Sequence, residues 1–425
     1  MHSHHSHSGQ FCRHAAPGTT LEDVVLAAIH AGFTTYGLSE HVPRYRKVDL
    51  YPEEEDLSPT DLLNTFTAYL TEAHRLRVKY AHVIDLLVGL ETDYITPLDI
   101  DQLQQLLQAE EETGAGVEYV VGSVHHVAEQ GIDFSKEWWE ACVDSFSTDT
   151  GTDHPTVPPP PHTQRLTKAL PDVPFPPAAV TAYLHAYLDA QHTLITRIHP
   201  TVIGHFDLCR LYIPKLPLNH PSLPGVWEKV ERNIKEVVAY GGLFEVSAAS
   251  FRKGWDEGYP GSEVLQVRYF PSASPVIYSL PHHPEPLVRL QRAHPVYCPV
   301  SDTQCIIANR GRLCLSDDSH GPASVALNYT RLRTYLVEQD VTELWYLARN
   351  TTVTGNSDSN AGMADENTTP SESVAATATP AVESTGESKE QRPWLVFQRR
   401  KLTPRKYDGR WADDPFWTRL SQRQT

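Results

Sequence analysis

Residues 85–126 read DLLVGLETDYITPLDIDQLQQLLQAEEETGAGVEYVVGSVHH, and this stretch decides the fold class. Residues 84–90 form an apolar run of the length of a buried strand, and a second such run covers residues 117–124. Between the two runs, apolar residues recur at helical spacing over about 99–112, and Gly114 ends that helix. Two buried strands joined by a helix pair in parallel, because a parallel connection needs a crossover of this length. The stretch therefore predicts a parallel α/β sheet.

The same alternation of strand and helix continues on both sides of this unit. Gly32 ends a predicted helix at 21–31, at a position where a positive φ suits glycine. Gly241 ends another at 222–239. About seven strands in a βα rhythm imply one parallel sheet, either closed or open. Further helices are predicted at 21–31, 60–82, 177–198 and 222–239, and short strands at the extreme N-terminus and at 34–38, 202–205, 243–246 and 313–315.

Three stretches interrupt this rhythm. Residues 149–176 contain PTVPPPPH, which cannot pair as a central strand because proline lacks the backbone donor. Residues 265–310 are rich in proline and histidine, and we interpret them as an insertion before the last strand. Residues 351–392 are mostly Ser, Thr, Ala and Glu with too few apolar groups to fold, so a disordered tract is expected there. The sheet-forming unit is then 1–345, and 393–425 is a C-terminal segment that could dock on it.

The overall composition excludes some classes of protein. The chain has 425 residues, of which 40% are hydrophobic, and a formal net charge of −17. Nucleic acid is not an expected partner, because proteins that bind it use Lys and Arg to neutralise phosphates. No run of 18 apolar residues indicates a transmembrane helix, and MHSHHSHSGQFC lacks the apolar core of a signal peptide. Six scattered cysteines without a CxxC pair indicate reduced thiols, so a cytoplasmic location is expected. The sequence leaves an oligomer possible.

Histidine is abundant, with 22 residues, and many of them stand where predicted strands end. His5 and His7 are two residues apart, so on an extended chain both imidazoles lie on the same side. If the sheet closes as a barrel, the carboxyl ends of its strands meet on one face, where active sites form. The other polar residues at or just beyond strand ends are His14, Glu40 with His41, Glu91, His125, His205 with Asp207, and Asp317, Asp318 and His320.

Imidazole and carboxylate groups suit Zn, Fe or Mn as ligands. About nine such residues exceed the four ligands of one tetrahedral site, so two or three ions sharing carboxylate bridges are expected. One strand end differs from the others, since LFEVSAASFRKG (243–254) has Ser247 at its end and Arg252 and Lys253 on the next loop. A guanidinium matches phosphate oxygens bidentately, so this loop is predicted to bind a phosphoryl group.

Each of these residues also has an ordinary structural explanation. An HxH pair near an N-terminus is by itself more often a solvated tail or a purification tag, and a lone Glu91 is more often a salt-bridge partner. Asp317 beside Asp318 fits a helix N-cap pair, and Arg252 with Lys253 fits a solvated loop. We favour the functional interpretation because nearly every predicted strand end carries such a residue, which is improbable by coincidence.

The succession of these motifs resembles a known family. HSHHSHSGQFCRHA, GLSEHVPR, VGLETDYI, VVGSVHHV, IGHFDL, EVSAASFRKG and LSDDSHGP follow one another between residues 2 and 322. This order is similar to that of the PHP (polymerase and histidinol phosphatase) superfamily, and more narrowly to its fungal-type histidinol-phosphatases. The resemblance implies a distorted (β/α)7 TIM-like barrel with long loop insertions and a centre of three metal ions. Residues after about 345 lie outside it.

The resemblance also assigns roles to individual residues. Glu91 resembles the bridging carboxylate of the family, and with Asp318 and His320 it is expected to act in catalysis. One extra residue separates His7 from His14 compared with many bacterial relatives. The implied metal ligands are His5, His7, His14, His41, Glu91, His125, His205, Asp318 and His320.

The resemblance and the positions of neighbouring residues also suggest substrate-binding and orienting roles. Arg252 resembles the phosphate-binding arginine of the family, and Lys253, which has no firm family role, and Ser247 are further candidates for binding the substrate. Glu40 and Asp207 are expected to orient His41 and His205, because ligating imidazoles usually donate their second N–H to a carboxylate.

The implied reaction is the hydrolysis of L-histidinol phosphate to L-histidinol and phosphate in histidine biosynthesis, by a metal-activated hydroxide. Two other interpretations stay open at this point. One is a PHP phosphoesterase acting on nucleotides or nucleic-acid ends, which the acidic net charge disfavours. The other is a non-catalytic metal-binding PHP protein, which the intact ligand set and Arg252 disfavour.

Overall fold

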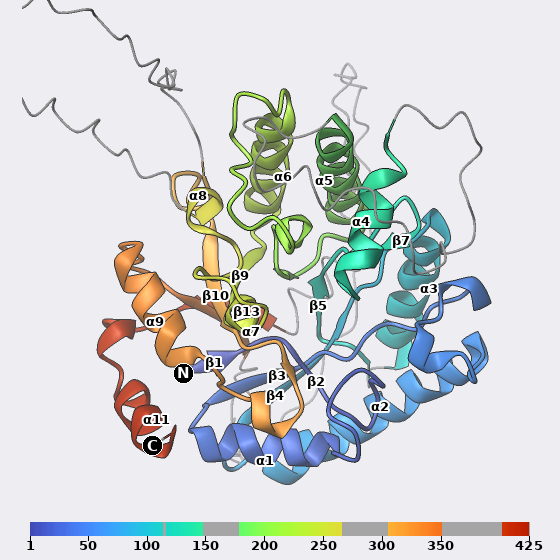
Figure 1. The fold of residues 1–425 in the computed structure, drawn as a ribbon. Coiled ribbons are helices and arrows are strands. Elements are labelled where there is room, and N and C mark those ends of the chain that lie inside the picture. Colours follow the sequence, from blue (N-terminus) through green and yellow to red (C-terminus); the bar gives the residue numbers. More distant parts are fainter. Residues whose placement is uncertain (114–115, 148–177, 266–304, 351–401, 425) are drawn as a thin grey trace, which may run out of the picture.

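Seven parallel strands form one sheet whose first and last members lie next to each other. The computed structural model describes residues 1–113, 116–147, 178–265, 305–350 and 402–424. The backbone N–H of His4, just beyond β1, donates to the carbonyl of Leu315 in β10 at 3.2 Å, which brings the sheet close to closure. The predicted α/β barrel-like sheet is therefore confirmed (Figure 1). In order across the sheet, the strands are β1 (His2–Ser3), β3 (Thr35–Leu38), β4 (Asp85–Glu91), β5 (Tyr119–Gly122), β8 (Val202–Ile203), β9 (Leu243–Ser247) and β10 (Arg312–Ser316).

Helices surround the strands on the outside of the barrel (Figure 1). The first of them begins with a capping box, in which the Thr20 hydroxyl accepts from the N–H of Asp23 and the Asp23 carboxylate accepts from the N–H of Thr20. It ends at Gly32, whose φ of 90° favours glycine. The helix predicted from residue 222 begins later, because residues 221–225 form turns. The helices are α1 (Leu21–Ala31), α2 (Pro59–Tyr80), α3 (Pro97–Thr113), α4 (Lys136–Asp144), α5 (Ala178–Ile198), α6 (Val226–Tyr240), α7 (Ala249–Arg252), α8 (Ser262–Leu265), α9 (Tyr329–Glu338) and α11 (Pro415–Gln424).

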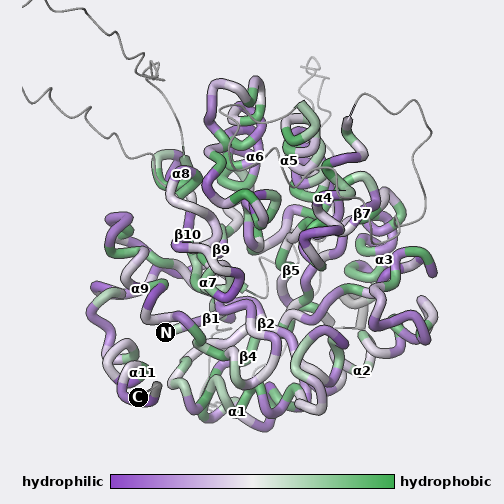
Figure 2. Tube along the Cα trace, in the orientation of Figure 1, coloured by the Kyte–Doolittle hydropathy of each residue, from purple (hydrophilic) through white to green (hydrophobic). Residues whose placement is uncertain are grey.

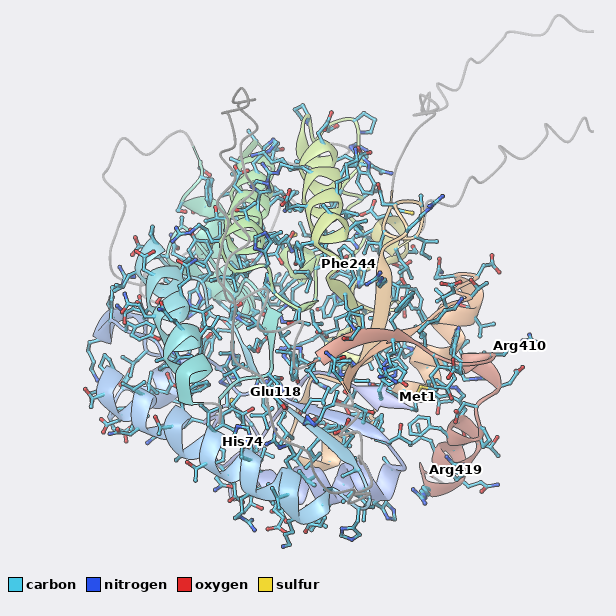
Figure 3. All side chains as sticks on the ribbon, turned by 180° about the vertical axis from the view of Figure 1, so that it is seen from behind. Met1, His74, Glu118, Phe244, Arg410 and Arg419 are labelled. Atoms are coloured by element: carbon cyan, nitrogen blue, oxygen red, sulfur yellow. The ribbon has the colours of Figure 1, made fainter. Side chains whose placement is uncertain are left out.

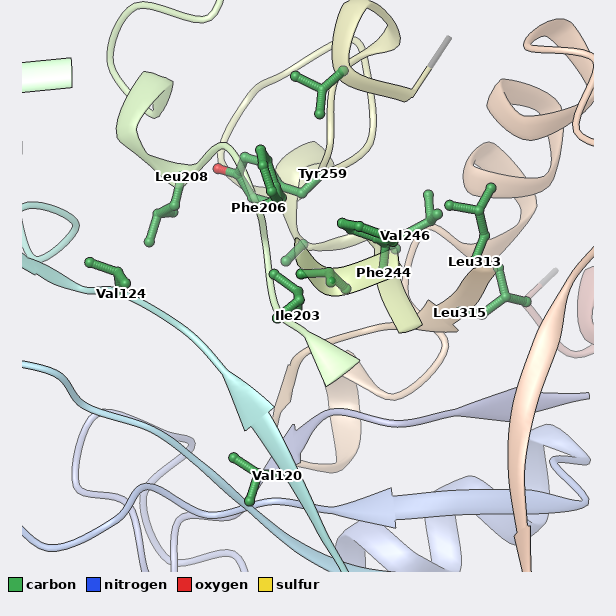
Figure 4. Close-up of a cluster of buried hydrophobic side chains, with 14 of the residues drawn as sticks. Val120, Val124, Ile203, Phe206, Leu208, Phe244, Val246, Tyr259, Leu313 and Leu315 are labelled. Carbon is green, nitrogen blue, oxygen red and sulfur yellow. The ribbon is translucent and has the colours of Figure 1, made fainter. Parts of the chain in front are cut away.

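The main hydrophobic core lies between these helices and the outer face of the sheet. Figure 2 shows hydrophobic and hydrophilic stretches alternating along the helices, as expected where one helix face packs inward. Ile203, Phe244 and Leu313 from neighbouring strands belong to this core (Figure 4). Their burial fixes which face of each strand points outward, and so which side chains point into the barrel.

The inner face of the barrel is tightly packed at the amino end of the strands and polar at their carboxyl end. Leu87, Gly89 and Glu91 share one face of β4, because side chains alternate along a strand. The ring of Tyr119 fills the interior beside Gly37 and Gly89, where an added Cβ would lie only 2.1 Å and 2.4 Å from atoms of the ring and its hydroxyl. The amino end of the inner face is thus tightly filled, whereas the carboxyl end presents polar groups such as Glu91.

A hairpin from the last part of the chain covers the amino end of the barrel. β12 (Trp345–Arg349) and β13 (Leu402–Lys406) pair antiparallel. Leu347 and Leu402 from this hairpin pack against inner-face residues that include Leu243. Figure 3, a view from behind, shows the hairpin between the labelled Phe244 and Met1. Beyond it, α11 packs against α1 and α9.

Shorter elements complete the described part of the chain. β2 (Ser6–His7) pairs in parallel with β11 (Ser319–His320), and β6 (His126–Val127) pairs with β7 (Gln130–Gly131). None of the described helices is long and apolar enough to cross a membrane. Single 3-10 turns lie at η1 (Lys47–Asp49), η2 (Pro52–Glu54), η3 (Leu208–Arg210), η4 (Pro322–Ser324) and η5 (Trp411–Asp413).

The predicted insertions at 149–176 and 265–310 lie almost wholly outside the described residues, and the 351–392 tract lies entirely outside them. Deleting 351–392 is expected to leave the unfolding temperature and the catalytic rate near wild type. Arg349 pairs with Leu402 across the hairpin, so the described segments on either side of the tract lie opposite each other, and the remaining residues 393–401 are enough to connect them. Thermal unfolding and turnover of the shortened chain are the measurements. A large loss of either would show that the tract is part of the folded body.

Candidate metal centre

Three pairs of imidazoles converge at the carboxyl end of the strands. The Nε2 atoms of His5 and His7 lie 3.2 Å apart. Those of His14 and His41 also lie 3.2 Å apart. Those of His125 and His205 lie 3.3 Å apart. In every pair it is the Nε2 atom that meets its partner, although only His5 and His7 are close together in the sequence.

Glu91 lies between two of these pairs. Its Oε1 is 3.0 Å from Nε2 of His5 and 3.1 Å from Nε2 of His205, and its Oε2 is 3.2 Å from Nε2 of His7. The residue ends β4 and is only 1% exposed. Its Oε1 therefore faces both pairs, which is the position expected of a carboxylate shared by two ions.

Asp318 and His320 reach the centre because β11 pairs with β2. The register places His320 beside His7, whose ring centroids are 4.6 Å apart, and the ring of His14 is 5.3 Å from that of His320. The φ of Asp318 is 46°, a left-handed conformation that turns the chain at this point. Its Oδ1 then lies 3.7 Å from Nε2 of His5 and 3.6 Å from that of His7.

The donor atoms fit divalent cations. Ligand bonds of about 2.0–2.1 Å at tetrahedral angles place two imidazole nitrogens about 3.3 Å apart, which is the spacing within all three pairs. The candidate ligand atoms fall into compact groups, each with all atoms within 4.8 Å of one another. Three of these groups contain every residue that the sequence predicted as a ligand: His5, His7 and Asp318; Glu91, His125 and His205; and His14, His41 and His320.

The second nitrogen of several imidazoles faces an acceptor, as expected for ligating histidines. Nδ1 of His5 lies 2.9 Å from Oε2 of Glu245, and Nδ1 of His14 lies 3.4 Å from Oε1 of Glu53. Nδ1 of His320 lies 3.0 Å from the carbonyl of Asp318. No sequence pattern indicated Glu53, which lies in the short turn η2, whereas Glu245 lies near the end of β9, where polar residues were expected.

Asp93 supports the pair around His125 and was also missed from the sequence. It is buried, and its Oδ1 lies 3.6 Å from Nδ1 of His125 and 3.1 Å from Nδ1 of His126. The other oxygen accepts from Arg44 at 3.1 Å and from the Tyr51 hydroxyl at 3.3 Å. Its position two residues after Glu91, on the strand-end loop, was the available clue.

Glu40 and Asp207 lie near the centre but beside other partners than expected. Glu40 accepts from the backbone and hydroxyl of Ser8 and lies 3.5 Å from Nδ1 of His7, not beside His41. Asp207 accepts from Arg210 at 2.5 Å and from the N–H of Gly261 at 2.9 Å. Their roles in orienting His41 and His205 stay predictions without a direct contact in this structure.

The loop predicted to bind phosphate reaches the centre through two of its three residues. Arg252 and Lys253 line the same cavity as the metal-site histidines. The Arg252 guanidinium donates to the carbonyls of Asp317 and Asp318 at 2.8 and 2.7 Å. Ser247 is fully buried and does not line this cavity, and its hydroxyl instead accepts from the N–H of Ala249.

The cavity has a volume of about 360 Å³, in the range of small-molecule sites. One wall carries the candidate ligands, among them Glu91, His205 and His320. The remaining lining comes from loops and short helices: Tyr51, Glu53, Asp133, Phe134, Leu208, Ala249, Arg252, Lys253 and Tyr259.

Buried carboxylates control the protonation of the imidazoles when no metal is bound. Burial lowers the pKa of His5, but the charges of Glu91 and Glu245 outweigh burial and raise that pKa well above its usual value. Burial likewise lowers the pKa of His7, and hydrogen bonds to Glu40 and Glu91 raise it to about 9. The shifted pKa values favour the protonated form of these imidazoles when no metal is bound.

Loading the metal-free protein with Zn²⁺ at pH 7 is expected to release protons. His5 and His7 are protonated because their pKa values are raised, and so is His125, where Glu91 and Asp93 overcome the effect of burial. A metal needs the free lone pair, so binding displaces these protons and the affinity falls as the pH is lowered. Titration in weak buffer with a pH indicator measures the release. An affinity that stays constant from pH 8 to 6 would contradict the assignment.

Comparison of the sequence with known proteins finds one domain model and two related fungal proteins. Residues 3–158 match the model of the PHP domain. The "Probable histidinol-phosphatase" of Schizosaccharomyces pombe is 36% identical over 343 residues, covering 80% of this chain and 88% of that protein. The histidinol-phosphatase of Saccharomyces cerevisiae is 26% identical over 380 residues, covering 82% and 90%.

A solved structure shows the same fold. It is that of a Listeria monocytogenes protein described as a "putative histidinol phosphatase", with a TM-score of 0.50 and 17% identity over 78% of this chain and 99% of that one. At this level of identity the likeness concerns the fold alone. The fold is that of a PHP-domain phosphoesterase, and the buried clusters of His, Glu and Asp are consistent with the metal sites of that family. The chain belongs to the histidinol-phosphatase family of PHP phosphoric monoester hydrolases, together with the two fungal enzymes.

Proposed function

We infer that this chain hydrolyses L-histidinol phosphate to L-histidinol and phosphate. The observation that carries the inference is that seven of the nine candidate metal ligands and two cationic side chains, Arg252 and Lys253, line one cavity. The similarity to two fungal histidinol-phosphatases over most of the chain supports the choice of substrate.

The proposed centre holds three divalent ions, Zn, Fe or Mn. One ion would be held by His5, His7, Glu91 and Asp318, a second by Glu91, His125 and His205, and a third by His14, His41 and His320. Such ions, when bound, lower the pKa of water and offset the negative charge of the phosphoryl oxygens.

The chain's own residues position the ester. Lys253 forms no ion pair within the described parts of the chain, so its ammonium is available to a phosphate dianion in the cavity. Arg252 is fixed by the carbonyls of Asp317 and Asp318, which orients its guanidinium beside Asp318. Glu40 and Asp207 do not line the cavity, so neither donates the proton to the leaving group in this proposal.

Steady-state turnover of a substrate panel tests the proposal. The metal-loaded protein is compared on histidinol phosphate and on several nucleoside monophosphates, with Glu91→Gln prepared in parallel to exclude a contaminating phosphatase. We expect histidinol phosphate to be strongly preferred and the Glu91→Gln protein to be inactive. Preference for nucleotides would overturn the assigned substrate, and tight metal binding without any turnover would indicate a non-catalytic metal protein.

A further inference from the structure

The carboxylate of Asp133, which lines the cavity, has no hydrogen-bond or ion-pair partner among the described residues. Asp133 is half-buried in the loop between β7 and α4 and lines the cavity. Across the described residues it forms neither a hydrogen bond nor an ion pair, whereas Glu53 and Glu91 in the same lining face histidines. It is not among the candidate metal ligands, so the proposed centre does not explain its presence.

An aromatic pair stands next to this carboxylate. Phe134 lines the cavity and leaves 45% of its surface exposed. Its ring stacks on that of Tyr51, with centroids 6.5 Å apart and an interplanar angle of 14°. The Arg44 guanidinium lies 4.3 Å from the centroid of the Tyr51 ring, so Tyr51 is held in place. The Phe134 ring therefore has one face stacked on Tyr51 and is partly exposed in the cavity lining, so it suits stacking with a flat aromatic group of a ligand.

The negative charge of Asp133 affects the pKa values of two tyrosines in the cavity lining. Burial is the main cause that raises the pKa of Tyr51 and of Tyr259, and the charge of Asp133 adds to both. Tyr259 is 2% exposed and its hydroxyl has no hydrogen-bond partner among the described residues. Figure 4 shows that hydroxyl directed toward Leu208, which also lines the cavity. A buried phenol without a partner is a second polar group that a ligand could satisfy.

Two different parts of the chain therefore bring opposite charges into the cavity lining. Arg252 and Lys253 enter it from the end of α7, which follows β9. Asp133 and Phe134 enter it from the loop before α4, which follows β5 and β7. A ligand with a phosphate at one end and a cationic, aromatic group at the other matches this arrangement.

We propose that Asp133 and Phe134 form the subsite that selects the organic part of the substrate. Asp133 accepts a hydrogen bond from an ammonium group, and Phe134 packs against a planar ring. The proposal rests on the proposed function, because histidinol phosphate carries both an ammonium and an imidazole beyond its phosphate ester.

Three phosphate monoesters separate the two contacts. Histidinol phosphate has an ammonium and a ring, phosphoethanolamine has an ammonium only, and propyl phosphate has neither. Asp133→Asn is expected to lower kcat/KM about 10- to 100-fold on the two cationic esters, mainly through KM, and far less on propyl phosphate. Phe134→Ala is expected to lose most on histidinol phosphate alone. Glu137→Gln, which removes the same charge from an exposed position of α4 nearby, should match wild type on all three.

A binding measurement checks the subsite without turnover. Calorimetry with L-histidinol, the product, should show a dissociation constant raised by a similar factor in Asp133→Asn but not in Glu137→Gln, at equal metal content. Equal losses on all three esters, or no loss in Asp133→Asn, would overturn the subsite. Failure of the proposed function is a different result, since the wild-type protein itself would then not prefer histidinol phosphate over nucleotides.

Discussion

The double variant His5→Ala, His7→Ala is expected to lose bound metal and to fall in kcat/KM by about three decades or more. Both imidazoles contact Glu91 and approach Asp318, so their removal takes two ligands from one proposed site and removes two of the imidazoles that face Glu91. Metal ions contribute several kcal/mol of transition-state stabilisation, which corresponds to a loss of that size. Metal analysis and steady-state kinetics are the measurements.

A matched control removes two histidines elsewhere. His30 and His82 are exposed and have no place in the centre, so His30→Ala, His82→Ala should keep metal content and activity. Circular dichroism of both double variants separates loss of metal from loss of fold. Full activity in the His5, His7 variant would show that these two histidines hold no ion needed for turnover.

Arg252→Ala is expected to lower kcat/KM by one to two decades. Charge-assisted hydrogen bonds are worth roughly 1.5–3 kcal/mol, and the guanidinium lies in the cavity beside Asp318. Metal content should stay close to wild type, because the Asp318 loop keeps its own contacts. The N–H of Asp318 donates to the Ser316 hydroxyl at 3.0 Å, and Asp317 accepts from the N–H of Ala326 at 2.7 Å.

The conservative variant sharpens this test. Arg252→Lys should recover only part of the lost efficiency, since an ammonium cannot make the bidentate contact of a guanidinium. Arg75→Ala removes the same charge from the exposed surface of α2 and should change nothing beyond about 0.5 kcal/mol. Wild-type efficiency in Arg252→Ala would remove Arg252 from the substrate site. A parallel loss of metal would instead assign it to holding Asp318.

The strands and the residues at their ends were predictable from the sequence. Alternation of side chains and the helix signals around residues 85–126 are local properties, and they correctly indicated β4, α3 and β5. A parallel closed sheet then brings every strand end to one side, so residues as distant as His5 and Asp318 could be expected to meet. The structure places their ligand atoms in one group.

The partners of these residues were not predictable in the same way. Glu40 follows the strand that ends near His41, but its side chain turns to Ser8 and His7. Asp133 belongs to a loop whose path depends on tertiary packing rather than on any repeating pattern. Loop conformation is set by contacts far apart in sequence, which spacing rules do not contain.

The pairing of β2 with β11 has a consequence for how the protein folds during its synthesis. Ser3 contacts Asp317, 314 positions further along the chain, and the neighbouring His5 and Asp318 would share an ion. During synthesis on the ribosome, the first histidines are made long before their carboxylate partner exists. The proposed ion site can therefore be complete only after about three quarters of the chain has been made. An ion bound there would bind the native state and not the unfolded chain. It would therefore stabilise the contact between the N-terminal segment and the segment around Asp318.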